Sequence, residues 1–283
     1  KRFDAVVTPH LYPAETLTAM KKKGWLKIPV VAIGTDYTCI PFWEETDCEY
    51  YVIPHEDLIE EFVKRGIPRE KLLPWGIPVR QSFMKQWNKK EARKICHIPQ
   101  NNKSYLVMGG SMGFGKIQIF VLELARRMEA DENMVVICGN NKKLEKLLKR
   151  ELVHRKNVKV LGYTDQVAAY MAACDVIFTK PGGLSSTEAA MMRIPMVHTN
   201  PIPGCETKNV EFFQKHGMSI GKRSFVGQVR TGEKLLEREK LRAQMQEAQK
   251  KNSRPEAAER ICKLLEELTG NKENRIIDLE IIQ

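Results

Sequence analysis

Short apolar runs alternate with amphipathic stretches in the first third of the chain. Three β-branched or aromatic runs predict strands: Phe3–Thr8, Val30–Thr35 and Tyr50–Ile53. The stretches at about 14–23 and 55–65 lie between these runs, and their pattern predicts helices. Residues 73–82 contain two prolines, which predict a hinge, and a polar helix is expected at about 83–95.

The pattern is more regular after residue 100. Four further runs predict buried strands after the one at Tyr105–Met108: Met134–Cys138, Val158–Leu161, Val176–Thr179 and Met196–Thr199. Amphipathic stripes between them predict helices, the first carrying Ile117, Phe120, Val121, Leu124, Ala125 and Met128. A last stripe, ending before Gly270, holds Ala258, Ile261, Cys262, Leu265 and Leu268. Strands that alternate with helices predict an α/β fold with parallel sheets.

Length and strand grouping predict two domains, each with its own parallel sheet. We expect the first over residues 1–95 and the second over 96–283, whose last helix crosses back to the first. Because the chain starts with Lys1 and enters a strand pattern at once, the first domain is expected to be incomplete, with a segment preceding Lys1.

Charge narrows the classes of partner. Lysine and arginine number 46 against 35 acidic residues, a surplus of +11. This surplus favours nucleic acid, phosphorylated ligands or anionic lipid, although a basic solvated surface explains it equally well. Nucleic acid is not expected, because basic residues are not interleaved with aromatic ones and no known binding motif appears. Seven scattered cysteines without a C-x-x-C pair fit a reducing cytoplasm.

A glycine-rich turn follows the strand at Tyr105–Met108. Closely spaced glycines let backbone N–H groups approach an anion, and the following helix adds its positive end. The turn nearly matches a phosphate-binding P-loop, but Ile117 stands where Ser or Thr would hold Mg²⁺. A dinucleotide fold needs an acidic residue after the second strand, and that place reads Cys138 to Lys142 without one. NAD is therefore not expected, and structural glycines remain the alternative.

Two more turns follow strands and open helices. In the run from Thr179 to Ala190, two glycines and three hydroxyl residues precede Glu188, which suits a diphosphate and a ribose. An ordinary capped helix, with Ser185 and Glu188 forming a capping box, is the alternative. In the run from Asn200 to Asn209, Glu206 and Asn209 offer polar groups suited to sugar hydroxyls.

The run Gly162–Gly221 resembles the donor-binding half of inverting GT-B glycosyltransferases, closest to the diacylglycerol glucosyltransferases and monogalactosyldiacylglycerol synthases. The phrase Thr-Lys-Pro-Gly-Gly-Leu through Glu-Ala is its most specific part. Further matching segments resemble the acceptor domain of that family: Pro29–Asp36 with Tyr37, Trp43, Tyr50 to Val52, and Gly76 to Arg80 with Phe83. The resemblance covers residues 3 to 265, about nine-tenths of the chain.

The resemblance implies two Rossmann-like domains facing a cleft, with the acceptor side in residues 1–95 and the donor side in 96–283, and a UDP-sugar substrate without a cofactor. No metal ion is expected, because the sequence shows no D-x-D pair and no zinc-ligand spacing of histidines. The residues that it implies for donor binding are Gly110, Ser111, Gly113, Gly115, Gly139, Gly162, Tyr163, Gly182, Gly183, Ser185, Ser186, Thr187, Glu188, Glu206 and Asn209. Among these, the glycine-rich turn would face the diphosphate, the backbone near Gly162 would hold uracil, and Glu188 would bind ribose. Family members usually carry Gln where this chain has Cys205, so the donated sugar stays open.

The acceptor side is less complete. The family begins with a glycine-rich turn carrying a His, and no such turn precedes the first strand here. His10 and Asp36 are the two candidates for the catalytic base, with a loop histidine as the alternative for His10. Lys21 to Lys23 with Trp25 suit an anionic membrane surface, or else form a solvated helix end.

The implied function is transfer of a hexose from a UDP-sugar to a lipid, with diacylglycerol as the expected acceptor. Two alternatives stay open: a lipid-linked N-acetylglucosaminyltransferase and a nucleotide-sugar-binding protein without catalysis. The expected location is cytoplasmic and peripheral, on the inner face of a membrane. No run of ~18 apolar residues predicts a membrane span.

Overall fold

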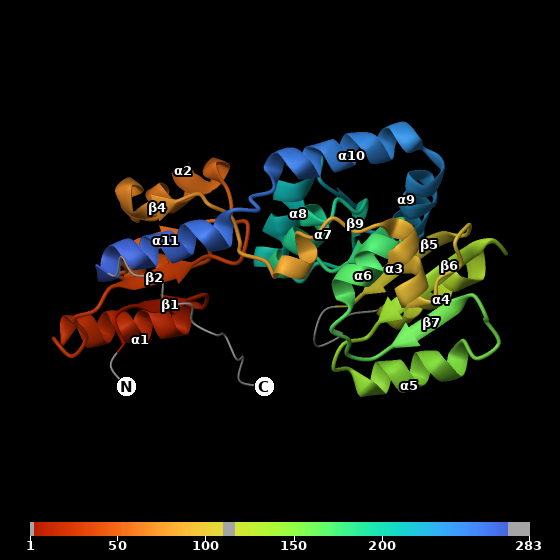
Figure 1. Ribbon diagram of the computed structural model, residues 1–283, viewed down its shortest axis with the longest axis horizontal. Helices are drawn as coiled ribbons and strands as arrows, with labels where there is room; N and C mark the ends of the chain where they lie inside the picture. The colour runs from red at the N-terminus through yellow and green to blue at the C-terminus, as the bar shows by residue number, and fades with distance from the viewer. Residues whose placement is uncertain (1–2, 110–116, 271–283) are drawn as a thin grey trace. The chain divides into compact units, whose positions relative to one another are not determined.

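The computed structural model describes residues 3–109 and 117–270, which form two compact units (Figure 1). The first unit contains residues 3–34, 41–77 and 256–270, and the second contains residues 35–40, 78–109 and 117–255. Each unit is built on its own parallel sheet covered by helices. The predicted α/β fold class with two parallel sheets is confirmed.

The first unit has a four-stranded parallel sheet in the order β1-β2-β3-β4. Its strands are β1 (Val6–Thr8), β2 (Val30–Ile33), β3 (Tyr50–Val52) and β4 (Leu72–Leu73). Its α-helices are α1 (Leu11–Lys22), α2 (Ile59–Lys64) and α11 (Ala257–Thr269), and its 3₁₀ turns are η1 (Trp43–Glu45), η2 (Glu56–Leu58) and η3 (Arg69–Lys71).

The chain's last helix completes the core of the first unit. Ile261 and Leu264 of α11 pack on Val31, Ile33 and Val52 of the sheet, so a helix far away in sequence covers strands near the N-terminus. Gly270 ends α11 with φ +67°, a left-handed conformation that glycine adopts without strain. The expectation that the last helix returns to the first sheet is confirmed.

The second unit has a six-stranded parallel sheet in the order β10-β9-β8-β5-β6-β7. Its strands are β5 (Lys103–Met108), β6 (Glu132–Ile137), β7 (Val158–Leu161), β8 (Val176–Thr179), β9 (Met196–His198) and β10 (Ile220–Gly221). Its helices are η4 (Gln81–Phe83), α3 (Lys89–Cys96), α4 (Ile117–Arg127), α5 (Lys142–Glu151), α6 (Val167–Ala173), α7 (Gly183–Met191), α8 (Cys205–Lys215), α9 (Phe225–Glu237) and α10 (Glu239–Asn252). The strand order reverses between β5 and β8, and sheets of this kind bind ligands beyond the carboxyl ends at such a reversal.

The amphipathic stripe predicted after residue 116 forms the inner face of α4. Phe120 is 1% exposed and meets Phe178 of β8 edge-on, with ring centroids 4.9 Å apart. Burying a side chain of this size stabilises the fold by about 1.5–3 kcal/mol, so the stripe fixes α4 on the sheet. No helix in the described ranges combines the length and apolar character that a bilayer span requires.

Two details of the sequence prediction differ from the structure. The helix expected at about 83–95 begins only at Lys89, because Asn88 caps it by accepting hydrogen bonds from the backbone N–H groups of Lys90 and Glu91. The two-residue strands β4 and β10 carry too short a pattern to stand out in the sequence and were not predicted.

The division between the units also differs from the expected boundary at residue 95. Helix α3 lies in the second unit, where Arg93 is 5% exposed and donates to the Ala173 carbonyl at 3.0 Å and to Asp175 at 3.0 Å. Helix α11 belongs to the first unit, and residues 35–40 pack with the second although β2 precedes them. Long-range packing therefore sets the division, which sequence order does not reveal.

Candidate donor-binding site

The predicted binding turns follow the carboxyl ends of neighbouring parallel strands. Met108 at the end of β5 pairs with Thr179 at the end of β8, so the turns that follow these strands start from one edge of the sheet, at the reversal point. Gly139, Gly162 and residues 200–209 follow β6, β7 and β9 at the same edge. Four predicted residues lie outside the described part of the chain: Gly110, Ser111, Gly113 and Gly115.

Helix α7 begins at Gly183, with Gly182 as its N-cap residue. Ser185 is therefore the third residue of the helix and not its cap. The capping-box interpretation of Ser185 and Glu188 is wrong, because a box needs the hydroxyl residue at the N-cap position. The first backbone N–H groups of α7 accordingly have no side-chain cap.

Gly183 is fixed by a close approach of the backbone. A Cβ atom at this position would lie 1.8 Å from the carbonyl oxygen of Thr35, whereas a Cβ at Gly182 would meet nothing within 4 Å. Any side chain at Gly183 would push α7 away from residues 35–36. The two glycines thus have different roles: one admits the neighbouring chain and the other leaves space at the helix end.

Two of the three hydroxyl groups of this turn are used inside the protein. Ser186 is fully buried and its Oγ lies 3.0 Å from Nε2 of His198. The Thr187 hydroxyl donates to the Gly183 carbonyl at 2.7 Å and lies 2.9 Å from the Tyr37 hydroxyl. As the structure stands, these contacts anchor α7 and do not present the two hydroxyls to a ligand.

Ser185 and Glu188 have a different environment. They lie three residues apart on α7, both half-buried, and among the described residues neither side chain has a hydrogen-bond or ion-pair partner. Burial raises the pKa of Glu188 from 4.5 to about 7, while the positive charge of Arg80 lowers it. A half-buried carboxylate without a partner costs free energy, and hydroxyl groups of a ligand would repay it.

Glu206 joins the second turn to the third. Its carboxylate forms an ion pair with Lys180 at 2.8 Å and accepts the Ile202 N–H at 2.7 Å. Both charged side chains are largely shielded from solvent, at 17% and 13% exposure. The pair holds the 200–206 loop next to the start of α7.

Asn209 is completely buried and makes three hydrogen bonds within the protein. Its Nδ2 donates to Asp36 Oδ1 at 2.9 Å and to the Pro181 carbonyl at 2.9 Å, and its Oδ1 accepts the Tyr37 N–H at 2.7 Å. Both amide hydrogens are therefore used. This arrangement differs from the expected contact with a sugar, since the Asn209 amide donors face the protein.

The remaining predicted residues are more exposed. Gly139 has φ +57°, which a glycine adopts without strain after β6. A Cβ atom at Gly162 would lie 2.5 Å from a Glu145 carboxylate oxygen, and the next residue, Tyr163, is 72% exposed. In the first unit, exposed His10 caps α1 by accepting the Tyr12 N–H at 3.3 Å, which is an ordinary structural role.

Two residues that stabilise the site were not predicted to act there. Tyr37 is 5% exposed, and its ring packs against Phe212 and Phe213. Burial raises the pKa of its hydroxyl, which lies near Thr187, to about 12. His198 is fully buried between Ser186 and Ser219, and burial lowers its pKa to about 3. For Tyr37 the sequence offered one signal, an aromatic residue directly after Asp36. For His198 it offered none.

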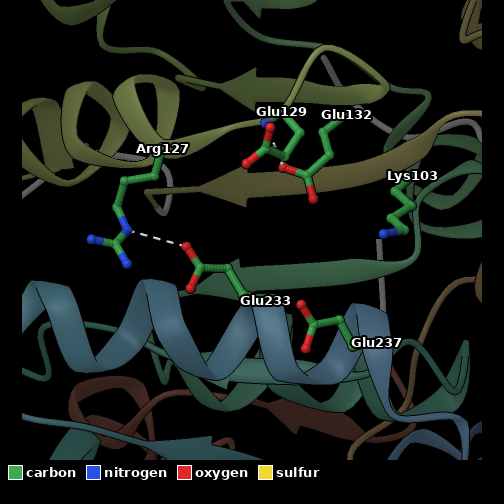
Figure 2. A pocket seen from close by; sticks show the side chains of 6 residues that line it. All are labelled: Lys103, Arg127, Glu129, Glu132, Glu233 and Glu237. Atoms are coloured by element: carbon green, nitrogen blue, oxygen red, sulfur yellow. Dashed lines mark hydrogen bonds and ion pairs between the residues drawn. The ribbon is translucent and has the colours of Figure 1, made fainter.

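One cavity borders the third turn, and another lies at the opposite edge of the sheet. One, of about 500 Å³, is lined by Asn200, His198, Gln228 and the face of α8 that carries Thr207 and Glu211, a different face from that of Glu206 and Asn209. The other, of about 380 Å³, lies at the amino ends of β5 and β6, opposite to the predicted site. Figure 2 shows acidic side chains, including Glu132 and Glu233, around this second cavity.

The lysine cluster of the first unit is only partly exposed. Lys21 is bound to Glu49 and to the Asp47 carbonyl, and its side chain is 16% exposed. Lys22 and Lys23 are exposed, and the Lys23 ammonium lies 4.7 Å from the ring centre of Trp25, itself 70% exposed.

Taken together, the fold and the turns define an α/β protein with two parallel sheets, the second of which has helix-opening turns at the carboxyl ends of its strands. Residues 88–252 match the family described as glycosyl transferases group 1, and residues 1–79 match monogalactosyldiacylglycerol (MGDG) synthase. The first match covers more than half of the chain, and the chain belongs to the group 1 glycosyltransferase family.

Curated relatives agree with this assignment. A processive diacylglycerol beta-glucosyltransferase of Staphylococcus carnosus (strain TM300) is 30% identical over 208 residues, which are 73% of this chain and 53% of that protein. The enzyme of the same description from Bacillus thuringiensis (strain Al Hakam) is 28% identical over 269 residues, 94% of this chain and 68% of its own length. The chain thus spans about half the length of the first of these relatives.

Solved structures share the fold. Acinetobacter baumannii MurG superposes with a TM-score of 0.66 at 17% identity, covering 93% of this chain and 73% of MurG. The S. aureus MnaA–UDP structure has a TM-score of 0.69 at 16% identity, covering 96% of this chain and 78% of MnaA. The expected resemblance to the diacylglycerol glucosyltransferases and to the GT-B fold is confirmed.

Proposed function

We propose that this protein transfers a hexose from a UDP-sugar to a lipid acceptor, with inversion at the anomeric carbon. Diacylglycerol is the acceptor that we propose. The observation that carries the proposal is the pair Ser185 and Glu188 in α7, which are half-buried and have no hydrogen-bond or ion-pair partner within residues 3–109 and 117–270. The curated relatives, named as diacylglycerol glucosyltransferases, support the lipid acceptor.

The donor would bind at the carboxyl edge of the second sheet. Uncapped N–H groups and the positive end of α7 would accept the diphosphate, since both favour an anion. Ser185 would add one hydroxyl contact. Glu188 would accept the two ribose hydroxyls in its ionised form, and Gly162 with Tyr163 would contact uracil.

Asp36 is the base that the arrangement favours. Its Oδ1 is held by Asn209, while its Oδ2 has no partner among the described residues. The negative charge of Asp36 helps to raise the pKa of Cys205, the first residue of α8, so the carboxylate lies near the N-terminus of that helix. In the reaction, Asp36 would take the proton of the acceptor hydroxyl as the oxygen attacks the anomeric carbon. The bond from that carbon to the UDP oxygen breaks, and UDP leaves towards α7.

The acceptor would be reached from a membrane surface. Lys22, Lys23 and Trp25 combine exposed positive charge with an exposed aromatic ring, which suits an anionic bilayer. Each basic residue close to such a surface contributes about 1 kcal/mol. The protein would accordingly be peripheral, on the inner, cytoplasmic face of a membrane.

The experiment has two parts. Calorimetric titration measures UDP and NAD binding to the 283-residue chain, and UDP alone is expected to bind. Transfer of radiolabelled glucose from UDP-glucose is then measured with the complete gene product on vesicles containing diacylglycerol. Equal binding of NAD and UDP would refute the donor assignment. UDP binding without transfer to any lipid would instead favour a non-catalytic nucleotide-sugar-binding protein.

A further inference from the structure

Asn209 lies at the centre of a hydrogen-bonded cluster that joins residues 35–37 to the start of α7. It contacts the Asp36 carboxylate, the Tyr37 N–H and the Pro181 carbonyl. Tyr37 extends the cluster through its hydroxyl to Thr187, and Thr35 touches Gly183. These four hydrogen bonds and the close backbone approach at Gly183 leave little freedom to the segment that carries Asp36.

The position of Asn209 within the protein excludes direct contact with a substrate. The side chain is 0% exposed, and its two amide hydrogens are both donated to protein oxygens. An apolar side chain of equal volume would leave the Tyr37 N–H, the Pro181 carbonyl and Oδ1 of Asp36 without this partner. The polar contacts therefore serve the groups they bind, of which the Asp36 carboxylate is the only ionisable one.

We infer that Asn209 is a positioning residue for Asp36: its amide holds Oδ1 so that Oδ2 points away from the cluster and is available to a substrate proton. This inference rests on the proposed function, because it gives Asp36 the role of base. In many active sites a third group fixes the orientation of the catalytic base. Asn209 does so as a neutral donor, which orients the carboxylate without supplying the full positive charge of a lysine or arginine.

The same amide also binds the carbonyl of Pro181, one residue before the N-cap of α7. The base and the diphosphate-binding helix end therefore share one anchor. The arrangement sets the distance between the acceptor hydroxyl and the anomeric carbon, on which the rate depends steeply. Asn209 would thus act on the rate more than on donor affinity.

A double-mutant cycle tests this role with the complete gene product on diacylglycerol vesicles. Asn209→Ala is expected to lower kcat by about 10–10²-fold, which does not exceed the lower end of the ~10²–10⁴-fold that general-base catalysis contributes, because Asp36 itself remains. In the Asp36→Ala background the same substitution is expected to change kcat by less than about twofold, because residues that act as a unit are not additive. UDP affinity, measured by calorimetry, is expected to stay within about threefold, since Asn209 does not touch the donor.

Gln249→Ala is the matched structural control. Gln249 is also 0% exposed, and its amide donates to the carbonyls of Ile194 and Met218 at 2.9 and 3.0 Å. Its loss is expected to lower the melting temperature without lowering kcat per folded molecule. A second readout is Asn209→Asp, which places a like charge beside Asp36 and is expected to move the acidic limb of the pH–rate profile to higher pH.

The possible outcomes separate the inference from the proposed function. If the unmodified protein binds no UDP or transfers no sugar, the proposed function fails and the role of Asn209 fails with it. If the unmodified protein transfers sugar but Asn209→Ala costs the same in both backgrounds, or no more than Gln249→Ala, only the positioning role is overturned. An unchanged pH–rate profile in Asn209→Asp would likewise overturn it.

Discussion

Replacing Glu188 by Gln tests the ribose contact most directly, because it removes the charge and keeps the shape. Glu188 has no hydrogen-bond or ion-pair partner among the described residues, so its substitution breaks no protein contact of that kind. Charge-assisted hydrogen bonds to two ribose hydroxyls are worth about 1–3 kcal/mol. UDP-glucose affinity is therefore expected to fall by about 5- to 150-fold, since 1.4 kcal/mol corresponds to a factor of ten.

The dependence on pH follows from the pKa of Glu188, which burial raises to about 7. Between pH 6 and pH 8 the ionised fraction rises from about one-tenth to about nine-tenths, so donor affinity is expected to increase about tenfold over this range. UDP-glucose is the better probe, because its substituted diphosphate has no ionisation in that window, unlike the terminal phosphate of UDP. The Glu188→Gln variant is expected to bind weakly with no such pH dependence.

Stability changes in the opposite direction. Between pH 4.5 and about 7 the native protein keeps a proton on Glu188 that the unfolded chain has released, so the free energy of unfolding falls as pH rises. The loss amounts to at most about 3 kcal/mol, and Glu188→Gln is expected to remove it. Calorimetric titration of both proteins at pH 6, 7 and 8, with melting curves, measures both effects. An unchanged affinity per folded molecule in the variant would refute the ribose contact, and a pH-independent affinity in the unmodified protein would refute its ionisation.

Three other changes give clear expectations. Gly183→Ala is expected to destabilise the protein by more than about 2 kcal/mol in chemical denaturation, because its Cβ would lie 1.8 Å from the Thr35 carbonyl oxygen. Gly182→Ala is the control, and equal stability of the two variants would contradict the close packing at Gly183. Burial lowers the pKa of His198 to about 3. Between about pH 3 and 6.5 this side chain is therefore neutral in the native state and protonated in the unfolded chain. The free energy of unfolding should therefore fall as pH drops through this window, by up to about 1.4 kcal/mol per pH unit, and His198→Gln should flatten the profile. Trp25→Ala is expected to reduce the fraction of protein that sediments with anionic vesicles at low salt. Lys21→Ala should not reduce it, because the Lys21 ammonium already binds Glu49. A larger loss of binding in Lys21→Ala than in Trp25→Ala would contradict this membrane surface.

The local patterns of the sequence determined the elements and the edge of the sheet at which ligands bind. The stripe from Ile117 to Met128 predicted α4, because a helix on a sheet needs one apolar face. Strands followed by glycine turns predicted a parallel sheet with its binding edge at the carboxyl ends. The run from Thr179 to Ala190 predicted a helix start suited to an anion, and Ser185 and Glu188 in that helix have no partner in the part of the chain that the structure describes.

Only the tertiary structure decided which polar residues face a ligand and which hold the fold. Ser185 and Ser186 are indistinguishable in sequence, yet one lies on the open side of α7 and the other against His198. Asn209 was expected to contact a sugar and instead binds Asp36, which lies 173 residues earlier in the chain. Contacts between residues so far apart in the sequence depend on how strands and helices pack in three dimensions. The local sequence pattern around either residue therefore does not predict them.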